Sequence, residues 1–154
     1  MEQKRPSGEV QFGSDPPRSD APIRKRVDRI VSVSMSAEQI RKGLPMKAVY
    51  DVARVLNVDH ALLADLLGTS VRTLQRKAGE RARLGPVASD RLARVNRILD
   101  LATHVLGEQD KAARWLTSQS RTLGGEVPLR MLDTDIGTQR VEQELRQIEF
   151  GMPF

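Results

Sequence analysis

From residue 36 onward, apolar side chains recur every three or four positions, which is the spacing of amphipathic helices. Ser36 and Gln39 form a capping-box pattern, Gly43 stops the short helix that follows, and Pro45 suits the first position of the next helix. The expected helices cover residues 37–42, 45–56, 60–67, 71–77, 86–106 and 134–149, with a short helix capped by Asp110 and a helical turn beginning at Pro128. The sequence therefore predicts an all-α fold.

Residues 1–35 lack this helical spacing of apolar side chains. The first 26 residues are rich in Pro, Gly, Ser and charge, as in flexible arms, and VDRIVSVSM at 27–35 fits either a strand or an extended connector. A basic linker from Gly79 to Gly85 separates the rest into two parts. We expect a flexible basic arm and connector (1–35), a first helical domain (36–83) and a second helical domain (84–154).

The segment LADLLGTSVRTLQRK, residues 63–77, has the spacing of a helix-turn-helix. Ala64 lies four residues before Gly68, where two crossing helices leave room only for a small side chain. Leu74 lies six residues after Gly68 and should face the core, and Ser70 is a good N-cap for the second helix. The alternative is a helical hairpin that never contacts DNA.

The second helix of this motif leaves its polar side chains for solvent or DNA. Arg and Gln can pair with base edges, whereas Ser, Thr and Lys suit phosphates. Charge supports the DNA-binding interpretation, because residues 1–83 hold 16 Lys or Arg against 10 Asp or Glu, and residues 84–154 hold 9 against 10. The side chains left for DNA are Arg72, Thr73, Gln75, Arg76 and Lys77.

No catalytic constellation is recognisable, and we expect neither an enzyme nor a metal or cofactor site. The chain has no Cys, and His60 and His104 lie in different halves without a second His beside them. Four acidic residues around the start of the last helix are interpreted as complementing its dipole: Asp133, Asp135, Glu142 and Glu144. No apolar run is long enough to span a membrane and no signal peptide is recognisable, so we expect a cytoplasmic protein.

The C-terminal part is nearly neutral and ends in an apolar segment, Phe150-Gly-Met-Pro-Phe154. Such an end either inserts into a pocket of a partner protein or folds back on its own domain. The helix before it should bury one apolar stripe, formed by Ile136, Val141, Leu145 and Ile148.

Several stretches follow one another in the order of a known family: IRKGLPMKAV, LADLLGTSVRTLQRK, SDRLARVNRILDLATHVLG, KAARWL, GGEVPLRMLDTDIG and RQIEFGMPF. From about residue 36 to the end, the sequence resembles type II antitoxins of the Xre/MbcA/ParS group. The resemblance implies an N-terminal helix-turn-helix followed by a toxin-binding domain. It also implies a RES-domain toxin that destroys NAD⁺ as the partner, an inhibitory C-terminal segment at the toxin's active-site cleft, and repression of the chain's own operon.

Carried onto this sequence, the family pattern gives two sets of site residues. Ser70, Arg72, Thr73, Gln75, Arg76 and Lys77 fall on the DNA-recognition helix, and Arg146, Glu149, Phe150, Gly151, Met152, Pro153 and Phe154 are the candidates for toxin contact. Five further motif residues are expected to have mainly structural roles: Trp115, Leu116, Gly125, Pro128 and Leu129.

Two other functions compete with this one. The chain could be a stand-alone transcription regulator whose C-terminal domain only dimerises, or a regulator that senses a small molecule. Because helix-turn-helix proteins usually bind paired half-sites, we expect at least a homodimer, or a higher hetero-oligomer with the toxin, bound to operator DNA.

Overall fold

The computed structural model describes residues 35–76 and 82–151, and all regular elements within them are helical. The elements are α2 (Ala37–Lys42), α3 (Met46–Leu56), α4 (His60–Leu66), α5 (Val71–Arg76), α6 (Pro86–Leu106), α7 (Gln109–Thr117), the 3₁₀ helix η1 (Pro128–Asp133) and α8 (Asp135–Glu149). The all-α prediction is confirmed. The arm, the connector up to residue 34, Lys77 and residues 152–154 lie outside the described residues.

The helix boundaries follow local capping chemistry. Ser36 and Gln39 form the predicted capping box, and α2 ends at Gly43, whose φ of 87° suits glycine. Asp59 accepts a hydrogen bond from the Leu62 N–H at 2.7 Å and starts α4. Pro45 occupies the N-cap of α3, one residue earlier than expected. These signals are local, so the sequence alone carries them.

Two local predictions are wrong. Asp110 does not cap α7, because the helix already begins at Gln109 with Glu108 at the N-cap. Ile136 does not belong to the buried stripe of α8, since its side chain is 75% exposed. The buried face of α8 is centred on Gly137, Val141 and Leu145, and a neighbouring residue lies about 100° around the helix from that face.

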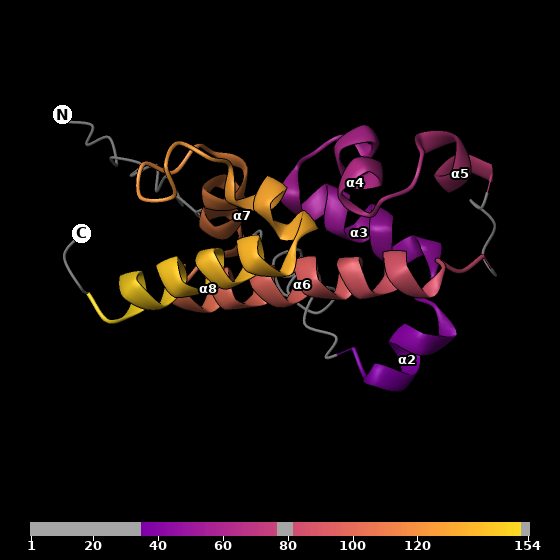
Figure 1. Ribbon diagram of the computed structural model, residues 1–154, viewed down its shortest axis with the longest axis horizontal. Coiled ribbons are helices and arrows are strands. Elements are labelled where there is room, and N and C mark those ends of the chain that lie inside the picture. The colour runs from indigo at the N-terminus through magenta and orange to yellow at the C-terminus, as the bar shows by residue number, and fades with distance from the viewer. Residues whose placement is uncertain (1–34, 77–81, 152–154) are drawn as a thin grey trace, which may run out of the picture.

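Helix α6 lies at the centre of the helical packing. It packs against α2 and also against α7, η1 and α8, and Figure 1 shows α8 running beside it with α3 and α4 above. Its buried face includes Leu92, Val95, Ile98, Leu99 and Ala102. These residues belong to one continuous hydrophobic cluster that also contains core residues of α3, α4 and α8. The two helical parts are therefore joined by a shared core.

The chain segment before α6 is fixed to the loop before α3 by a short antiparallel bridge. The Leu84 N–H donates to Leu44 O at 2.8 Å, and the Met46 N–H donates to Ala82 O at 3.1 Å. Inside the core, the Leu44 N–H donates to Ser89 Oγ of α6 at 2.9 Å. The start of α6 is thus tied to the N-terminal helices by backbone as well as by side-chain packing.

Helix α8 approaches η1 through a glycine. A Cβ atom built on Gly137 would collide with the backbone carbonyl of Met131. Thr134 Oγ1 also accepts a hydrogen bond from the Gly137 N–H at 3.1 Å, so both the cap and the close approach fix the start of α8. A larger residue at position 137 would push α8 away from η1.

We predict that Gly137→Ala lowers the free energy of unfolding by about 1–3 kcal/mol, because the added methyl group forces the backbones of α8 and η1 apart. Urea denaturation followed by circular dichroism measures the loss. Gly85→Ala is the matched control, since Gly85 has a φ of −66° and nothing within 4 Å of an added Cβ. Equal stability of Gly137→Ala and the wild type would contradict the close approach.

Candidate DNA-binding and protein-binding surfaces

Helices α4 and α5 have the geometry that the spacing predicted. Ala64, Leu67 and Leu74 are all buried where the two helices meet. Gly68 has a φ of 67°, which favours glycine, and the Thr69 N–H donates to Ala64 O at 2.9 Å to close the turn. The structure therefore contains a helix-turn-helix with a packed interior.

The predicted DNA-binding residues of α5 fall into two groups. Ser70 and Thr73 bind each other: the Thr73 N–H donates to Ser70 Oγ at 3.1 Å, and the two hydroxyls lie 2.9 Å apart. Arg72, Gln75 and Arg76 are exposed and lie on the described outer surface of α5. Ser70 and Thr73 thus cap the helix, while the two arginines and the glutamine are available for base or phosphate contacts.

The turn between α4 and α5 also makes a contact that the sequence does not indicate. A Cβ atom on Gly68 would lie 2.5 Å from Nη1 of Arg91, so the guanidinium of this α6 residue covers the turn. Position 68 therefore needs glycine for its conformation and for the space that Arg91 occupies. Twenty or more residues separate the two positions, and no local pattern could have indicated the contact.

The start of α4 carries one of the two histidines. His60 is exposed, and its ring meets that of Tyr50 edge-on with centroids 5.0 Å apart. His104 lies in the last turn of α6, and its Nε2 is 3.5 Å from Glu149 Oε1. The two histidines therefore have different surroundings. His60 packs on the ring of Tyr50 in α3, and His104 lies beside Glu149 of α8.

The C-terminal end of α8 is solvent-exposed. Phe150 is 70% exposed, and Arg146, Glu149 and Gly151 are exposed as well. Four of the seven candidates for toxin contact therefore form one accessible surface at the end of α8, which we call the α8 end. The remaining candidates, Met152, Pro153 and Phe154, lie outside the described residues.

The motif residues expected to be structural are placed accordingly. Leu116 and Leu129 are completely buried, Pro128 is buried, and Trp115 is half-buried against the core. Gly125 has a φ of 84°, and its N–H donates to Ser120 O at 2.8 Å. These residues hold α7, the following loop and η1 together.

The dipole interpretation of the acidic group is wrong for two members. Glu144 is only 6% exposed and accepts a hydrogen bond from Thr122 Oγ1. Glu142 forms an ion pair with Arg97 of α6 at 2.6 Å. Asp135 does lie in the first turn of α8. The two glutamates instead fix α8 to the loop and to α6.

Two negative observations apply to residues 35–76 and 82–151. No group of three or more His, Asp or Glu side chains is placed to hold a metal ion. No helix there is both long enough and apolar enough to cross a membrane.

The two candidate surfaces lie far apart. Figure 1 shows α5 at one end of the long axis of the molecule and the C-terminal end of α8 at the other, with α6 running between them.

Two family comparisons cover most of the chain. The antitoxin Xre-like helix-turn-helix domain matches residues 35–97, and the antitoxin Xre/MbcA/ParS C-terminal toxin-binding domain matches residues 101–151. The first match includes α2 to α5 and extends into α6, and the second includes the end of α6, α7, η1 and α8.

Individual relatives agree with these matches. An Antitoxin Xre from Photorhabdus laumondii is 29% identical over 73% of this chain and 77% of its own length. An Antitoxin Xre from Pseudomonas putida is 40% identical over 53% of this chain, and the match spans only 51% of that relative. A protein from a Sphingobium species named Prs ADP-ribosylating antitoxin is 31% identical over 73% of this chain and 76% of its own length. The chain therefore belongs to the Xre/MbcA/ParS family of antitoxins from toxin–antitoxin systems.

Proposed function

We propose that the chain neutralises a RES-domain toxin that degrades NAD⁺ by covering the toxin's active-site cleft with the α8 end and the residues that follow it. We also propose that it represses its own operon by binding promoter DNA through α5. In this proposal residues 36–83 form the DNA-binding part, residues 84–154 form the toxin-binding part, and neither carries out catalysis.

The exposed α8 end is the observation that carries the toxin-binding half of the proposal. An aromatic side chain with most of its surface in water lies next to Arg146 and Glu149, so one surface combines an apolar anchor with charged groups. Buried aromatic and arginine side chains dominate the energetics of protein interfaces. Blocking a cleft requires a segment that can enter it and a few polar contacts, and the exposed Phe150 with Arg146 and Glu149 supports this role.

The DNA-binding half is supported by α5. Arg72, Gln75 and Arg76 project from a helix whose opposite side is anchored by the buried Leu74. Arginine can bind guanine edges or phosphates, and glutamine can bind adenine edges. We propose that the protein acts as a homodimer, since paired helix-turn-helix units match two-fold operators.

The Sphingobium relative favours a second class of toxin. Its name links it to ADP-ribosylation, a reaction that also consumes NAD⁺ but transfers the ADP-ribose to an acceptor. The two toxin classes are distinguished by their products. A purified partner that releases ADP-ribose into solution is an NAD⁺-degrading toxin, and one that labels a protein acceptor is an ADP-ribosylating toxin.

We predict that Arg72→Ala or Arg76→Ala weakens binding to the chain's own promoter DNA by about 1–3 kcal/mol if the side chain contacts a base. If the side chain contacts a phosphate, the loss of affinity is the same for every DNA sequence. The slope of log K for DNA binding against log salt concentration then becomes shallower by about one. Fluorescence anisotropy at several salt concentrations separates the two cases. Arg114→Ala, an exposed arginine of α7, is the control, and unchanged binding by both α5 variants would refute the assignment.

We predict that deletion of residues 151–154, combined with Phe150→Ala, abolishes toxin neutralisation and leaves promoter binding intact. The reason is that the change removes the apolar anchor of the α8 end and does not touch α5. Growth of cells that co-express the toxin gives the readout, together with cellular NAD⁺.

The matched control for the deletion is Ile136→Ser. Ile136 is another exposed apolar residue of α8, but it lies at the opposite end of that helix, so this variant should still rescue growth. Rescue by the shortened chain would show that another surface binds the toxin. Loss of rescue by both variants would show that neutralisation does not depend on the α8 end in particular.

A further inference from the structure

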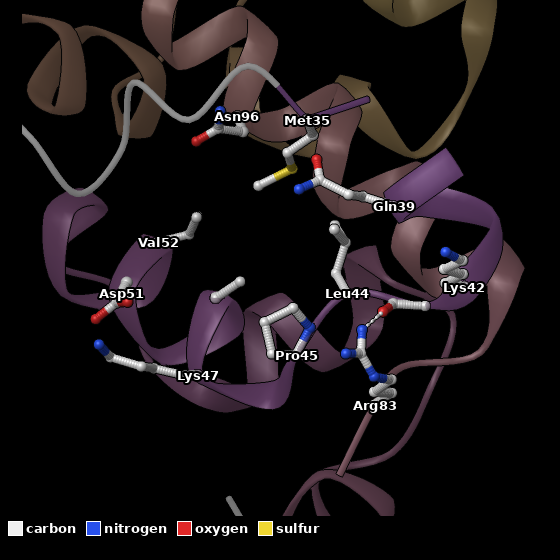
Figure 2. Close-up of a pocket in the computed structure, with 12 residues that line it drawn as sticks. Met35, Gln39, Lys42, Leu44, Pro45, Lys47, Asp51, Val52, Arg83 and Asn96 are labelled. Carbon is white, nitrogen blue, oxygen red and sulfur yellow. Dashed lines mark hydrogen bonds between the residues drawn. The ribbon is translucent and has the colours of Figure 1, made fainter. Parts of the chain in front are cut away.

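A pocket of about 540 Å³ lies between α2, α3 and α6, away from both α5 and the α8 end. Figure 2 shows side chains from these elements surrounding a common hollow. The volume is in the range of sites for small molecules. Neither DNA binding through α5 nor toxin binding through α8 uses it.

Most of the wall is aliphatic. Leu44, Pro45 and two residues of α3, Ala48 and Val52, line it. The thioether of Met35 lies at the upper edge in Figure 2. Removing an aliphatic wall from contact with water lowers the free energy, so binding of an apolar group is favourable here. The body of a ligand for this pocket should therefore be a hydrocarbon.

The rim is cationic. Lys42, Lys47 and Arg83 border the pocket, whereas the one carboxylate there, Asp51, is already paired with Arg54 at 2.8 Å. Lys42 pairs with Glu38, but both side chains are largely exposed and the pair is readily exchanged for another partner. The net charge around the pocket favours an anion.

Two polar groups are fixed in position. Arg83 donates from Nη1 to the Gly43 carbonyl at 2.7 Å, which holds the guanidinium at the rim while its other N–H groups stay available for a carboxylate. Asn96 of α6 is only 4% exposed, and its amide nitrogen donates to Asp100 at 3.3 Å. No donor among the described residues reaches the carbonyl oxygen of Asn96, so this oxygen is a preformed acceptor at the edge of the pocket.

We propose that this pocket binds an amphipathic carboxylate, with an aliphatic chain lying along Leu44, Pro45, Ala48 and Val52 and its carboxylate at Arg83 and the neighbouring lysines. Asn96 favours ligands that also carry a hydroxyl or amide N–H in the chain. A bare phosphate does not suit the aliphatic wall, and an aliphatic amine would meet three like charges at the rim. The proposed ligand site does not depend on the proposed toxin or operator. A result against one of these proposals therefore leaves the other unaffected.

The test is a titration of the full chain, labelled with ¹³C at the methionine methyl groups, with decanoate below the concentration at which decanoate aggregates. Met35 lines the pocket and reports occupancy, and Met131 of η1 reports non-specific effects in the same sample. We expect a saturable shift of Met35 alone, with a Kd of about 1 mM or lower. Acetate, which lacks the chain, and decylammonium, which reverses the charge, should give no saturable shift.

Three variants test the contacts. Ala48→Phe fills the hollow and should abolish the Met35 shift, whereas Lys47→Gln and Arg83→Gln remove rim charges and should each weaken binding by about threefold or more. Lys111→Gln, an exposed lysine of α7, is the matched control and should bind decanoate like the wild type. If Ala48→Phe does not fold, the ligand comparison on the wild type still decides the question.

Several outcomes would overturn the proposal. They are the absence of a saturable Met35 shift, equal shifts at Met131, equal binding of decylammonium, or full affinity in both charge variants. A Met35 shift that depends on protein concentration without any decanoate would identify a second copy of the chain as the occupant and would also overturn it.

Discussion

Burial of α6 on two sides is the constraint on which the rest of the structure depends. The same helix packs against α2 at its beginning and against α7, η1 and α8 along its length, so the helix-turn-helix and the C-terminal helices share one core. A helix of 21 residues spans roughly 30 Å. The backbone bridge between Leu84 and Leu44 ties its beginning to the N-terminal helices, and α5 packs on α4, so α5 and the α8 end lie at opposite ends of one hydrophobic core.

This arrangement suits the proposed functions, because the proposed DNA-binding and toxin-binding surfaces lie at opposite ends of the molecule. The recognition helix is a short element whose inner side carries one buried leucine, and its outer side is left to polar groups. The α8 end is different, because α8 is fixed by Gly137 against η1, by Glu142 against Arg97 and by Glu144 against Thr122. The exposed Phe150 thus projects from a firmly held helix.

The features that could be predicted from the sequence are the ones encoded locally. The spacing of Ala64, Gly68 and Leu74 indicated the helix-turn-helix, and small capping residues indicated most helix starts, because both depend on neighbours within a few positions. Ile136 faces solvent because it lies to one side of the buried stripe of α8. Glu144 is buried because Thr122, in the loop before η1, donates a hydrogen bond to it, and the helical pattern alone does not indicate this contact. Arg91 over the turn and the pocket between α2, α3 and α6 bring together residues distant in sequence, and no periodic pattern reports such contacts.

We propose above all that the two surfaces act independently from opposite ends of the molecule. The decisive measurement is native mass spectrometry of the purified antitoxin–toxin complex after addition of DNA from the chain's own promoter. We predict a single species that contains toxin, antitoxin and DNA, with the toxin still inactive toward NAD⁺. Release of the toxin on DNA binding, or failure of the toxin-bound protein to bind DNA, would contradict the account.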